Sequence, residues 1–356
     1  MTSVWRRLGV GLAVIAMTQV GASPAHRSGE ARPATPAHPA PPAAVRPAPS
    51  ALHDQVTSLA RAFDGKAGIA VVSLRDGWEL DWNAKTLFPQ QSCSKLWVAI
   101  TALDGVDHGR IRLDQQVALG RSDLTVFHQP IAAKILNGGT TATLGDLMFT
   151  AITESDNTAN DKLMRAIGGP AAVRAMIARK GLGSIRFYNG ERALQSKIAG
   201  LSWNPAYSLG SGFDDARNAL PMKVRKAAFA RYLASPYDGA SPHAVANALA
   251  ALKRGQLLSP GSTERLLSIM GRTRTGKMRV KAALAPGWDW NHKTGTGQEL
   301  GGRIGGINDI GLLTAPDGSV YAMALMAIPN HTDGSAQELM QSVAKAVIAA
   351  HEARAD

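Results

Sequence analysis

The chain has little cysteine and few aromatic residues. Cys93 is the one cysteine among 356 residues, so an intramolecular disulfide is excluded, and export would not need one. Aromatic residues make up only 5% of the sequence, and no run of lysine and arginine alternates with them. The formal net charge is nevertheless +12. A basic charge without the pattern of a nucleic-acid site predicts a soluble, exported protein that does not bind nucleic acid.

The N-terminus has one apolar run, at residues 8–17, which is too short to span a bilayer comfortably. It follows Arg6 and Arg7 and precedes small residues at 20–22, the order found in a secretory signal peptide. We therefore predict a signal peptide over residues 1–22 and a periplasmic or secreted protein. No cysteine lies near the cleavage site, so we expect no stable membrane anchor, although retention of an uncleaved signal stays open.

Residues 23–50 are rich in proline and alanine, which predicts an extended linker rather than a helix or strand. The remaining chain, residues 51–356, is predicted to be one domain that starts near Leu52. Period-two apolar patterns predict strands, and 3.6-residue patterns predict helices. The strands are expected at residues 68–74, 78–83, 288–296, 308–315 and 320–328, and the clearest helices at 52–63, 143–153, 159–167, 171–179 and 338–352.

Strands thus occur near both termini, and helices fill the middle of the chain. This order predicts an α/β (α+β) fold with an antiparallel sheet flanked by helices. We expect the sheet to be built from residues 51–88 and 270–356, with an all-helical part inserted at about 89–269. Active sites favour the cleft between two such parts.

Three short motifs follow one another along the chain: Ser-x-x-Lys at 92–95, Ser-Asp-Asn at 155–157 and Lys-Thr-Gly-Thr at 293–296. The first is expected about once by chance in a chain of this length, and each of the others in fewer than roughly one chain in ten. Together, and in this order, they supply every group needed to open an amide through an acyl-serine.

The first motif offers a nucleophile and a base. Ser92 and Lys95 are three residues apart at a predicted helix start, so their side chains share a face. The helix N-terminus helps to stabilise negative charge near Ser92. Lys95 must lose its proton to act as a base, which burial near a second cation such as Lys293 would favour. Taken alone, this motif would be interpreted as an N-capping serine followed by a surface lysine.

In the second motif, Ser155 and Asn157 lie on one side if the segment is a short extended loop. The hydroxyl of Ser155 would then carry a proton to a leaving nitrogen, and Asn157 would bind a substrate carbonyl. Asp156 would point away and hold the loop. The alternative interpretation is a helix-capping cluster without a catalytic role.

The third motif lies on a predicted strand. Lys293 would hold a substrate carboxylate, together with Thr294 and Thr296, and Gly295 would let the ligand approach the backbone. The backbone N–H groups of Thr296 and Ser92 would form an oxyanion hole. The alternative is an ordinary strand end with a surface lysine.

These motifs resemble those of the class A serine β-lactamases, which are related to the penicillin-binding DD-peptidases. The resemblance covers most of residues 52–350. It includes Thr-Arg-Thr-Gly at 273–276, Gln-Leu-Leu-Ser at 256–259 and Asn-Asp-Ile-Gly at 308–311, the last typical of the extended-spectrum subgroup. The resemblance implies a β-lactamase/transpeptidase-like fold, a β-lactam substrate, no cofactor and a monomer.

The resemblance also implies a loop glutamate that activates water. Glu191 lies 34 residues beyond Asn157, which matches the spacing of the family. Gln195 replaces the usual water-holding asparagine, and Asn189 replaces an arginine that normally pins the loop. A segment at about 196–241 is inserted beyond. The alternative for Glu191 is a solvent-exposed loop carboxylate.

Four other residues have two interpretations each. Cys93 would be a thiol nucleophile or a small buried residue; we favour burial because no histidine-containing partner motif accompanies it. Phe127 or His128 occupies the position of an aromatic residue at the cleft mouth in the family. No second ligand lies at metal spacing from His128, so we expect no metal. Arg303 would assist carboxylate binding or would be a solvated edge charge.

Three functions fit these motifs. The leading hypothesis is a serine β-lactamase, in which Ser92 is acylated after its proton passes to Lys95 or, through water, to Glu191. The second is a DD-carboxypeptidase or endopeptidase that acts on peptidoglycan. The third is a sensor or binding protein that is acylated and stays acylated. Glu191 distinguishes the first function from the others, and the absence of an apparent transmembrane or DNA-binding segment disfavours a sensor.

Overall fold

The computed structural model describes residues 46–354. The predicted signal peptide and most of the predicted linker therefore lie outside the described residues. The described chain is already folded at β1 (Arg46–Pro47) and α1 (Ser50–Ala62), so the domain starts before Leu52. Within residues 46–354, no helix has the length and apolar character needed to cross a membrane.

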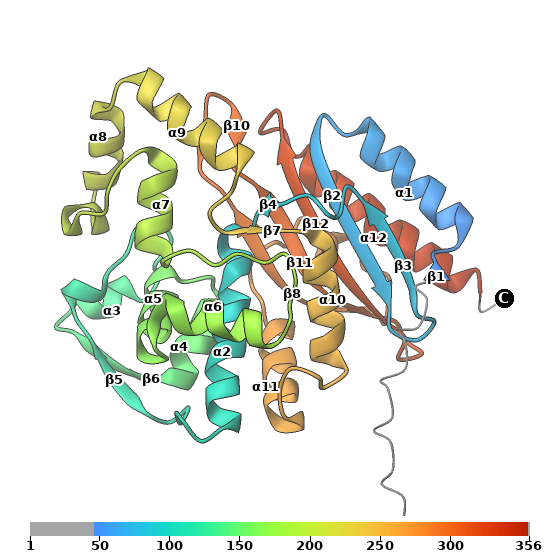
Figure 1. Cartoon of the computed structure of the whole chain (residues 1–356), viewed down its shortest axis with the longest axis horizontal. Coiled ribbons are helices and arrows are strands. Elements are labelled where there is room, and N and C mark those ends of the chain that lie inside the picture. Colours follow the sequence, from blue (N-terminus) through green and yellow to red (C-terminus); the bar gives the residue numbers. More distant parts are fainter. Residues whose placement is uncertain (1–45, 355–356) are drawn as a thin grey trace, which may run out of the picture. The chain divides into compact units, whose positions relative to one another are not determined.

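The central sheet has six strands among the described residues, in the order β1-β3-β2-β12-β11-β8 (Figure 1). Apart from the parallel β1–β3 pair, neighbouring strands are antiparallel. The N-terminal β2 pairs with the C-terminal β12, so both ends of the domain build the sheet, as predicted. The further strands are β2 (Gly65–Ser73), β3 (Trp78–Trp82), β8 (Asp289–Thr296), β11 (Ile307–Thr314) and β12 (Val320–Pro329).

Both faces of the sheet are covered, which explains why β2 and β12 are apolar along almost their whole length. Successive residues of β2 alternate between two hydrophobic cores. Ile69 and Val71 join the core of α1 and α12 (Ser335–Glu352), whereas Ala70 and Val72 join that of the helical part. Figure 1 shows α1 and α12 packed together beside the sheet.

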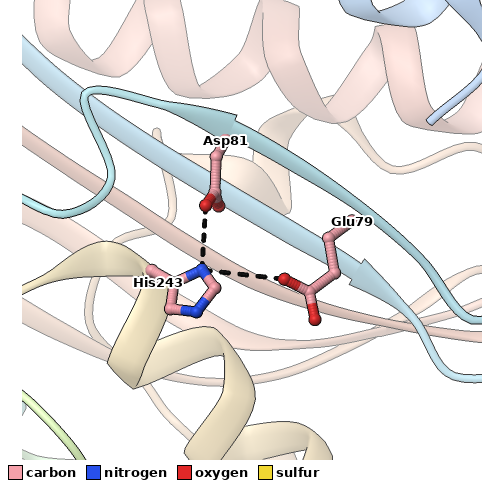
Figure 2. A group of neighbouring side chains, drawn as sticks. All are labelled: Glu79, Asp81 and His243. Carbon is pink, nitrogen blue, oxygen red and sulfur yellow. Dashed lines mark hydrogen bonds and ion pairs between the residues drawn. The ribbon is translucent and has the colours of Figure 1, made fainter. Parts of the chain in front are cut away.

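α10 (Pro242–Lys253) packs on the second face of the sheet, against β2 and β12. A polar contact also ties its first turn to β3 (Figure 2). The Nδ1 atom of His243 lies 2.8 Å from Asp81 Oδ2 and 3.6 Å from Glu79 Oε2. The helix is thus held both by apolar packing and by an ion-pair cluster at its start.

The middle of the chain is mostly helical, but it is not all-helical as predicted, because β5, β6 and β7 lie within residues 89–269. α2 runs through it with an unbroken buried stretch from Lys95 to Gly105. Two short strand pairs that the sequence did not indicate also occur: β4 (Phe88–Pro89) with β7 (Gly239–Ala240), and β5 (Gln116–Leu119) with β6 (Thr140–Thr143). Their strands are too short to show a period in the sequence. The helices are α2 (Lys95–Asp107), α3 (Ala132–Leu136), α4 (Leu144–Thr153), α5 (Asn157–Ala166), α6 (Gly169–Arg179), α7 (Glu191–Ala199), α8 (Gly212–Ala219), α9 (Met222–Ala234) and α11 (Pro260–Gly271).

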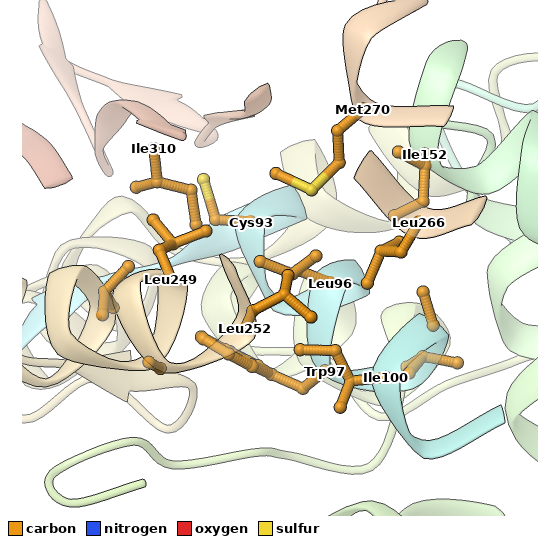
Figure 3. Close-up of a cluster of buried hydrophobic side chains, with 14 of the residues drawn as sticks. Cys93, Leu96, Trp97, Ile100, Ile152, Leu249, Leu252, Leu266, Met270 and Ile310 are labelled. Atoms are coloured by element: carbon orange, nitrogen blue, oxygen red, sulfur yellow. The ribbon is translucent and has the colours of Figure 1, made fainter. Parts of the chain in front are cut away.

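Cys93 belongs to the core of the helical part (Figure 3). Its side chain lies among Leu96, Trp97 and Leu249, and only 1% of the residue is exposed. Burial raises the pKa of the thiol to about 12, so it stays protonated at neutral pH. The interpretation as a small buried residue therefore holds, and the thiol is not a nucleophile.

The same core predicts the effect of truncating Leu252, a fully buried residue of α10. Leu252→Ala should lower the free energy of unfolding by about 3 kcal/mol, because it removes buried apolar atoms and leaves a cavity. Urea denaturation followed by circular dichroism measures this change. The matched control, Leu209→Ala, alters a leucine that is 37% exposed and should stay within about 0.5 kcal/mol of the parent. Equal losses in the two variants would contradict the assignment of this core.

Candidate active site

Ser92 lies in a 3-10 turn (Gln91–Ser94) that leads directly into α2. Gln91 has a φ of 53°, a left-handed conformation that is uncommon for a residue with a side chain. Its backbone N–H donates a 2.7 Å hydrogen bond to Asp238 Oδ2, and the Tyr232 hydroxyl donates to Asp238 Oδ1 at 2.9 Å. Burial raises the pKa of Asp238 to about 6. A buried carboxylate thus holds the turn that presents Ser92.

Lys95 projects from the first residue of α2 into a ring of acceptors. Its Nζ atom donates to Ser92 Oγ at 2.9 Å, to the Ser155 carbonyl at 2.7 Å and to Asn157 Oδ1 at 2.6 Å. The side chain is fully buried, so these contacts replace water around the amine. The predicted pairing of Ser92 with Lys95 is therefore present, and a surface lysine is excluded.

The second motif reaches Lys95 through a backbone geometry that differs from the prediction. The segment is not an extended loop: Ser155 has a φ of 61°, and Asn157 is the first residue of α5. Asp156 is the N-cap, accepting 2.8 Å and 2.7 Å hydrogen bonds from the backbone N–H groups of Ala159 and Ile131. Asp156 therefore holds the turn, as expected, and capping coexists with the placement of the other two side chains at Lys95.

Lys293 lies on β8 and joins the hydrogen-bonded side chains around Lys95. Its Nζ atom donates to Ser155 Oγ at 2.8 Å, and Lys95 Nζ lies 3.3 Å from the same oxygen. Burial, followed by the charge of Lys95, lowers the pKa of Lys293 to about 7. Hydrogen bonds thus connect Lys293, Ser155, Lys95 and Ser92 in one continuous path.

The third motif packs directly against the turn that carries Ser92. A Cβ atom on Gly295 would lie 2.3 Å from the Gln90 carbonyl oxygen, so only glycine fits there. The sequence suggested that Gly295 makes room for a ligand, whereas the structure shows that it makes room for the backbone before Ser92. Thr294 is held by a 2.6 Å hydrogen bond between its hydroxyl and that of Thr275.

Glu191 is buried at the start of α7 and lies against Lys95, so the exposed-carboxylate interpretation is excluded. Its Oε1 atom is 3.4 Å from Lys95 Nζ, and Gln195 Nε2 donates to its Oε2 at 3.1 Å. The backbone N–H of Glu191 donates to Asp161 Oδ1 at 2.9 Å. Burial, and then the charge of Glu191, raises the pKa of Asp161 to about 6.

The loop before Glu191 lacks the arginine of the family at Asn189, but a different arginine holds it. The Arg174 guanidinium, from α6, donates to Asn189 Oδ1 at 3.2 Å and to the Phe187 carbonyl at 3.3 Å. Beyond Glu191, Gln298 Nε2 donates to Gln195 Oε1 at 2.9 Å. The amide that replaces the usual asparagine is therefore fixed from the opposite side of the cleft.

Most of the predicted residues line one cleft of about 480 Å³, whereas Lys95, Glu191 and Lys293 are buried and contact residues of this site without lining the cleft themselves. Arg303 does not take part: it lies exposed on β10 (Arg303–Ile304), away from the lining. The sequence missed Arg279, which is buried in the lining and donates to the Asn308 carbonyl at 2.6 Å and to the Thr296 hydroxyl. The lining consists of Ser92, Phe127, His128, Ser155, Asn157, Gln195, Arg217, Thr275, Gly276, Arg279, Thr294, Thr296, Gly297, Gln298 and Glu299.

Phe127 and His128 both lie at this cleft. Phe127 is 45% exposed and packs edge-to-face against Phe213 of α8, with 4.8 Å between ring centroids. The His128 ring Nε2 is 2.8 Å from the Glu154 carbonyl oxygen. The aromatic residue predicted at the cleft mouth is therefore Phe127, and the inserted segment packs against it.

One cluster has the residue types of a metal site, but it lies outside the cleft. Ligand atoms of Glu79, Asp81 and His243 all fall within 4.8 Å of one another (Figure 2). The sequence did not indicate it, because His243 is distant from the other two along the chain. The contacts of His243 with both carboxylates account for the cluster as an ion pair, and we assign no metal to it.

The chain matches the β-lactamase enzyme family over residues 51–351, a span that contains every residue of this site. The chain belongs to this family. Among its relatives, the β-lactamase CTX-M-97 of Escherichia coli is 26% identical over 299 residues, 84% of this chain and 88% of the relative. The β-lactamase VEB-1 of Pseudomonas aeruginosa is 25% identical over 82% of this chain and 87% of the relative.

Solved structures agree with this assignment. A β-lactamase from Chitinophaga pinensis superposes with a TM-score of 0.69 at 26% identity, covering 85% of this chain and 99% of the other. The extended-spectrum β-lactamase TLA-3 has the same fold, with a TM-score of 0.68 at 24% identity over 84% of this chain and 97% of the other. The class A serine β-lactamase identity predicted from the three motifs is confirmed.

Proposed function

We propose that the chain hydrolyses the β-lactam amide of penicillins and cephalosporins through an acyl-serine intermediate, and so confers antibiotic resistance. The observation that carries the proposal is the hydrogen-bonded path from Lys293 through Ser155 and Lys95 to Ser92. Glu191 lies beside Lys95, the member of this path that contacts Ser92. The relatives CTX-M-97 and VEB-1 are β-lactamases, which agrees with the proposal.

In the acylation step, Ser92 Oγ attacks the lactam carbonyl and gives its proton to Lys95 or, through a water, to Glu191. The backbone N–H groups of Ser92 and Thr296 stabilise the oxyanion. The C–N bond of the ring then breaks, and Ser155 passes a proton to the nitrogen that leaves. The contact between Ser155 Oγ and both lysines supports this role.

Substrate binding uses residues in and around the same cleft. Lys293, Thr294 and Thr296 hold the carboxylate of the substrate, and Arg279 fixes this wall of the cleft through its hydrogen bonds to the Thr296 hydroxyl and to backbone carbonyls of β8 and β11. Asn157 binds the carbonyl of the acyl side chain through its amide. That amide also donates to the Val126 carbonyl at 2.8 Å, which fixes its orientation.

Deacylation needs a water, a base and a fixed position for both. Glu191 is the base, and the Gln195 amide, held by Gln298, orients the water. A buried carboxylate beside Lys95 favours turnover over the two alternatives, a DD-peptidase and an acylated sensor, which do not need it. We therefore place hydrolysis first among the three functions.

The setting of the enzyme follows from the sequence. We infer that residues 1–22 are removed as a signal peptide, that residues 23–50 are mostly linker, and that residues 51–356 act in the periplasm or outside the cell. The resemblance to the family favours a monomer.

Glu191→Gln should leave acylation measurable but slow deacylation by roughly 10²–10⁴-fold, because the glutamine amide has the shape of the carboxylate but cannot act as a base. Intact-protein mass spectrometry after mixing with benzylpenicillin should show a persistent covalent adduct. Ser92→Ala should show none. Glu338→Gln makes the same change on an exposed residue of α12 and should turn over like the parent. Parental turnover by Glu191→Gln would remove the proposed role of this residue.

The lowered pKa of Lys293, about 7, predicts that kcat/KM for benzylpenicillin falls as the pH rises above 7. The ammonium of the free enzyme loses its proton in this range, and with it the charge that binds the substrate carboxylate; kcat/KM reports groups of the free enzyme. In Lys293→Arg the guanidinium stays charged, so the fall should move beyond about pH 10. A wild-type profile that is flat from pH 7 to 9.5 would contradict this role.

A further inference from the structure

The inserted segment contributes a cation to the cleft that none of the three motifs contains. Arg217, on α8, lines the same cleft as Ser92, and 23% of its side chain is exposed. Two other charged residues line the cleft among the described residues. Arg279 is committed to backbone carbonyls of β8 and β11, and Glu299 is an exposed carboxylate beyond the end of β8.

The segment that carries Arg217 is docked against the rest of the protein. Phe213 packs against Phe127 with 4.8 Å between ring centroids, and the Arg217 guanidinium lies 5.9 Å from the Phe213 ring. Gln129 Nε2 donates a 2.7 Å hydrogen bond to the Ser208 carbonyl. α8 is therefore held at the cleft mouth by both aromatic and polar contacts.

Arg217 also has unused hydrogen-bonding capacity. One terminal nitrogen donates to Asp214 Oδ1 at 2.7 Å, and the Asp214 side chain is 55% exposed. The Nε atom is buried and has no hydrogen-bond partner within residues 46–354. A buried donor without a partner is unfavourable, and a shift of the guanidinium toward an anionic group in the cleft would satisfy it.

We propose that Arg217 and Phe127 form a subsite for the acyl side chain of the substrate, and that this subsite favours side chains with an aromatic ring and a carboxylate. The Phe127 ring, supported by the buried Phe213, offers an apolar wall, and the guanidinium offers a forked donor that matches a carboxylate. This inference rests on the proposed function, because it assigns a substrate class to the same cleft.

Carbenicillin and benzylpenicillin provide the test, because they differ by one carboxylate beside the phenyl ring of the side chain. The quantity to measure is the ratio of kcat/KM for carbenicillin to that for benzylpenicillin. Arg217→Gln should lower this ratio about tenfold, the effect of losing one charge-assisted hydrogen bond. Lys226→Gln removes an exposed cation of α9 in the same inserted segment and should leave the ratio unchanged.

Asp214→Asn provides an independent variant, because it frees Arg217 without touching the lining. In this variant, the ratio of kcat/KM for carbenicillin to that for benzylpenicillin should rise above that of the parent. Arg217→Glu should invert the selectivity, so that ampicillin, which has an ammonium group at the same position, is preferred to carbenicillin. A ratio within twofold of the parent in Arg217→Gln and Asp214→Asn would overturn the subsite.

The same measurements distinguish failure of the proposed function from failure of the subsite. A wild-type protein that hydrolyses neither penicillin would overturn that function, and the subsite with it. A wild type that hydrolyses benzylpenicillin while the ratio is insensitive to residue 217 would overturn the subsite alone. Thermal unfolding of each variant, compared with the parent, shows whether the variant still folds. If Arg217→Gln does not fold, the carbenicillin-to-benzylpenicillin ratio of Asp214→Asn decides the test.

Discussion

The buried amine of Lys95 is the group on which the arrangement of the site depends. A charged or strongly polar group without water must be surrounded by partners, or its burial costs several kcal/mol. The partners of Lys95 come from the turn before α2, from the turn between α4 and α5, and from the start of α7. Segments that are far apart in sequence are thus tied to one nitrogen, which brings Ser92, Ser155 and Glu191 together.

Much of this site was predictable because most of its residues belong to short motifs with fixed spacing. Ser92 and Lys95 share a helical face at a separation of three, and Lys293 was predicted from the Lys-Thr-Gly-Thr motif on an expected strand. Glu191 was predicted from its separation from Asn157 and is indeed buried beside Lys95. The sheet could also be predicted from the sequence, because β2 and β12 are covered on both faces and therefore appear as apolar runs.

What the sequence could not reveal depends on contacts between distant segments. Arg279 has no motif of its own, and only the packing of the strands shows that it enters the cleft instead of Arg303. The left-handed conformation of Ser155 was missed because no local pattern marks it for a residue other than glycine. The aromatic contact of Phe213 with Phe127 likewise joins an inserted segment to a loop that precedes it by many residues.

Glu191 lies just before the inserted segment and Asp238 lies near its end, and both contact residues around Ser92. Glu191 lies against Lys95, and Asp238 holds the turn before Ser92. The entropy of closing a loop grows only with the logarithm of its length, so a segment fixed at both ends tolerates insertions cheaply. The stretch between these two anchors can therefore change in length while the contacts of Lys95 and of the turn before Ser92 stay unchanged.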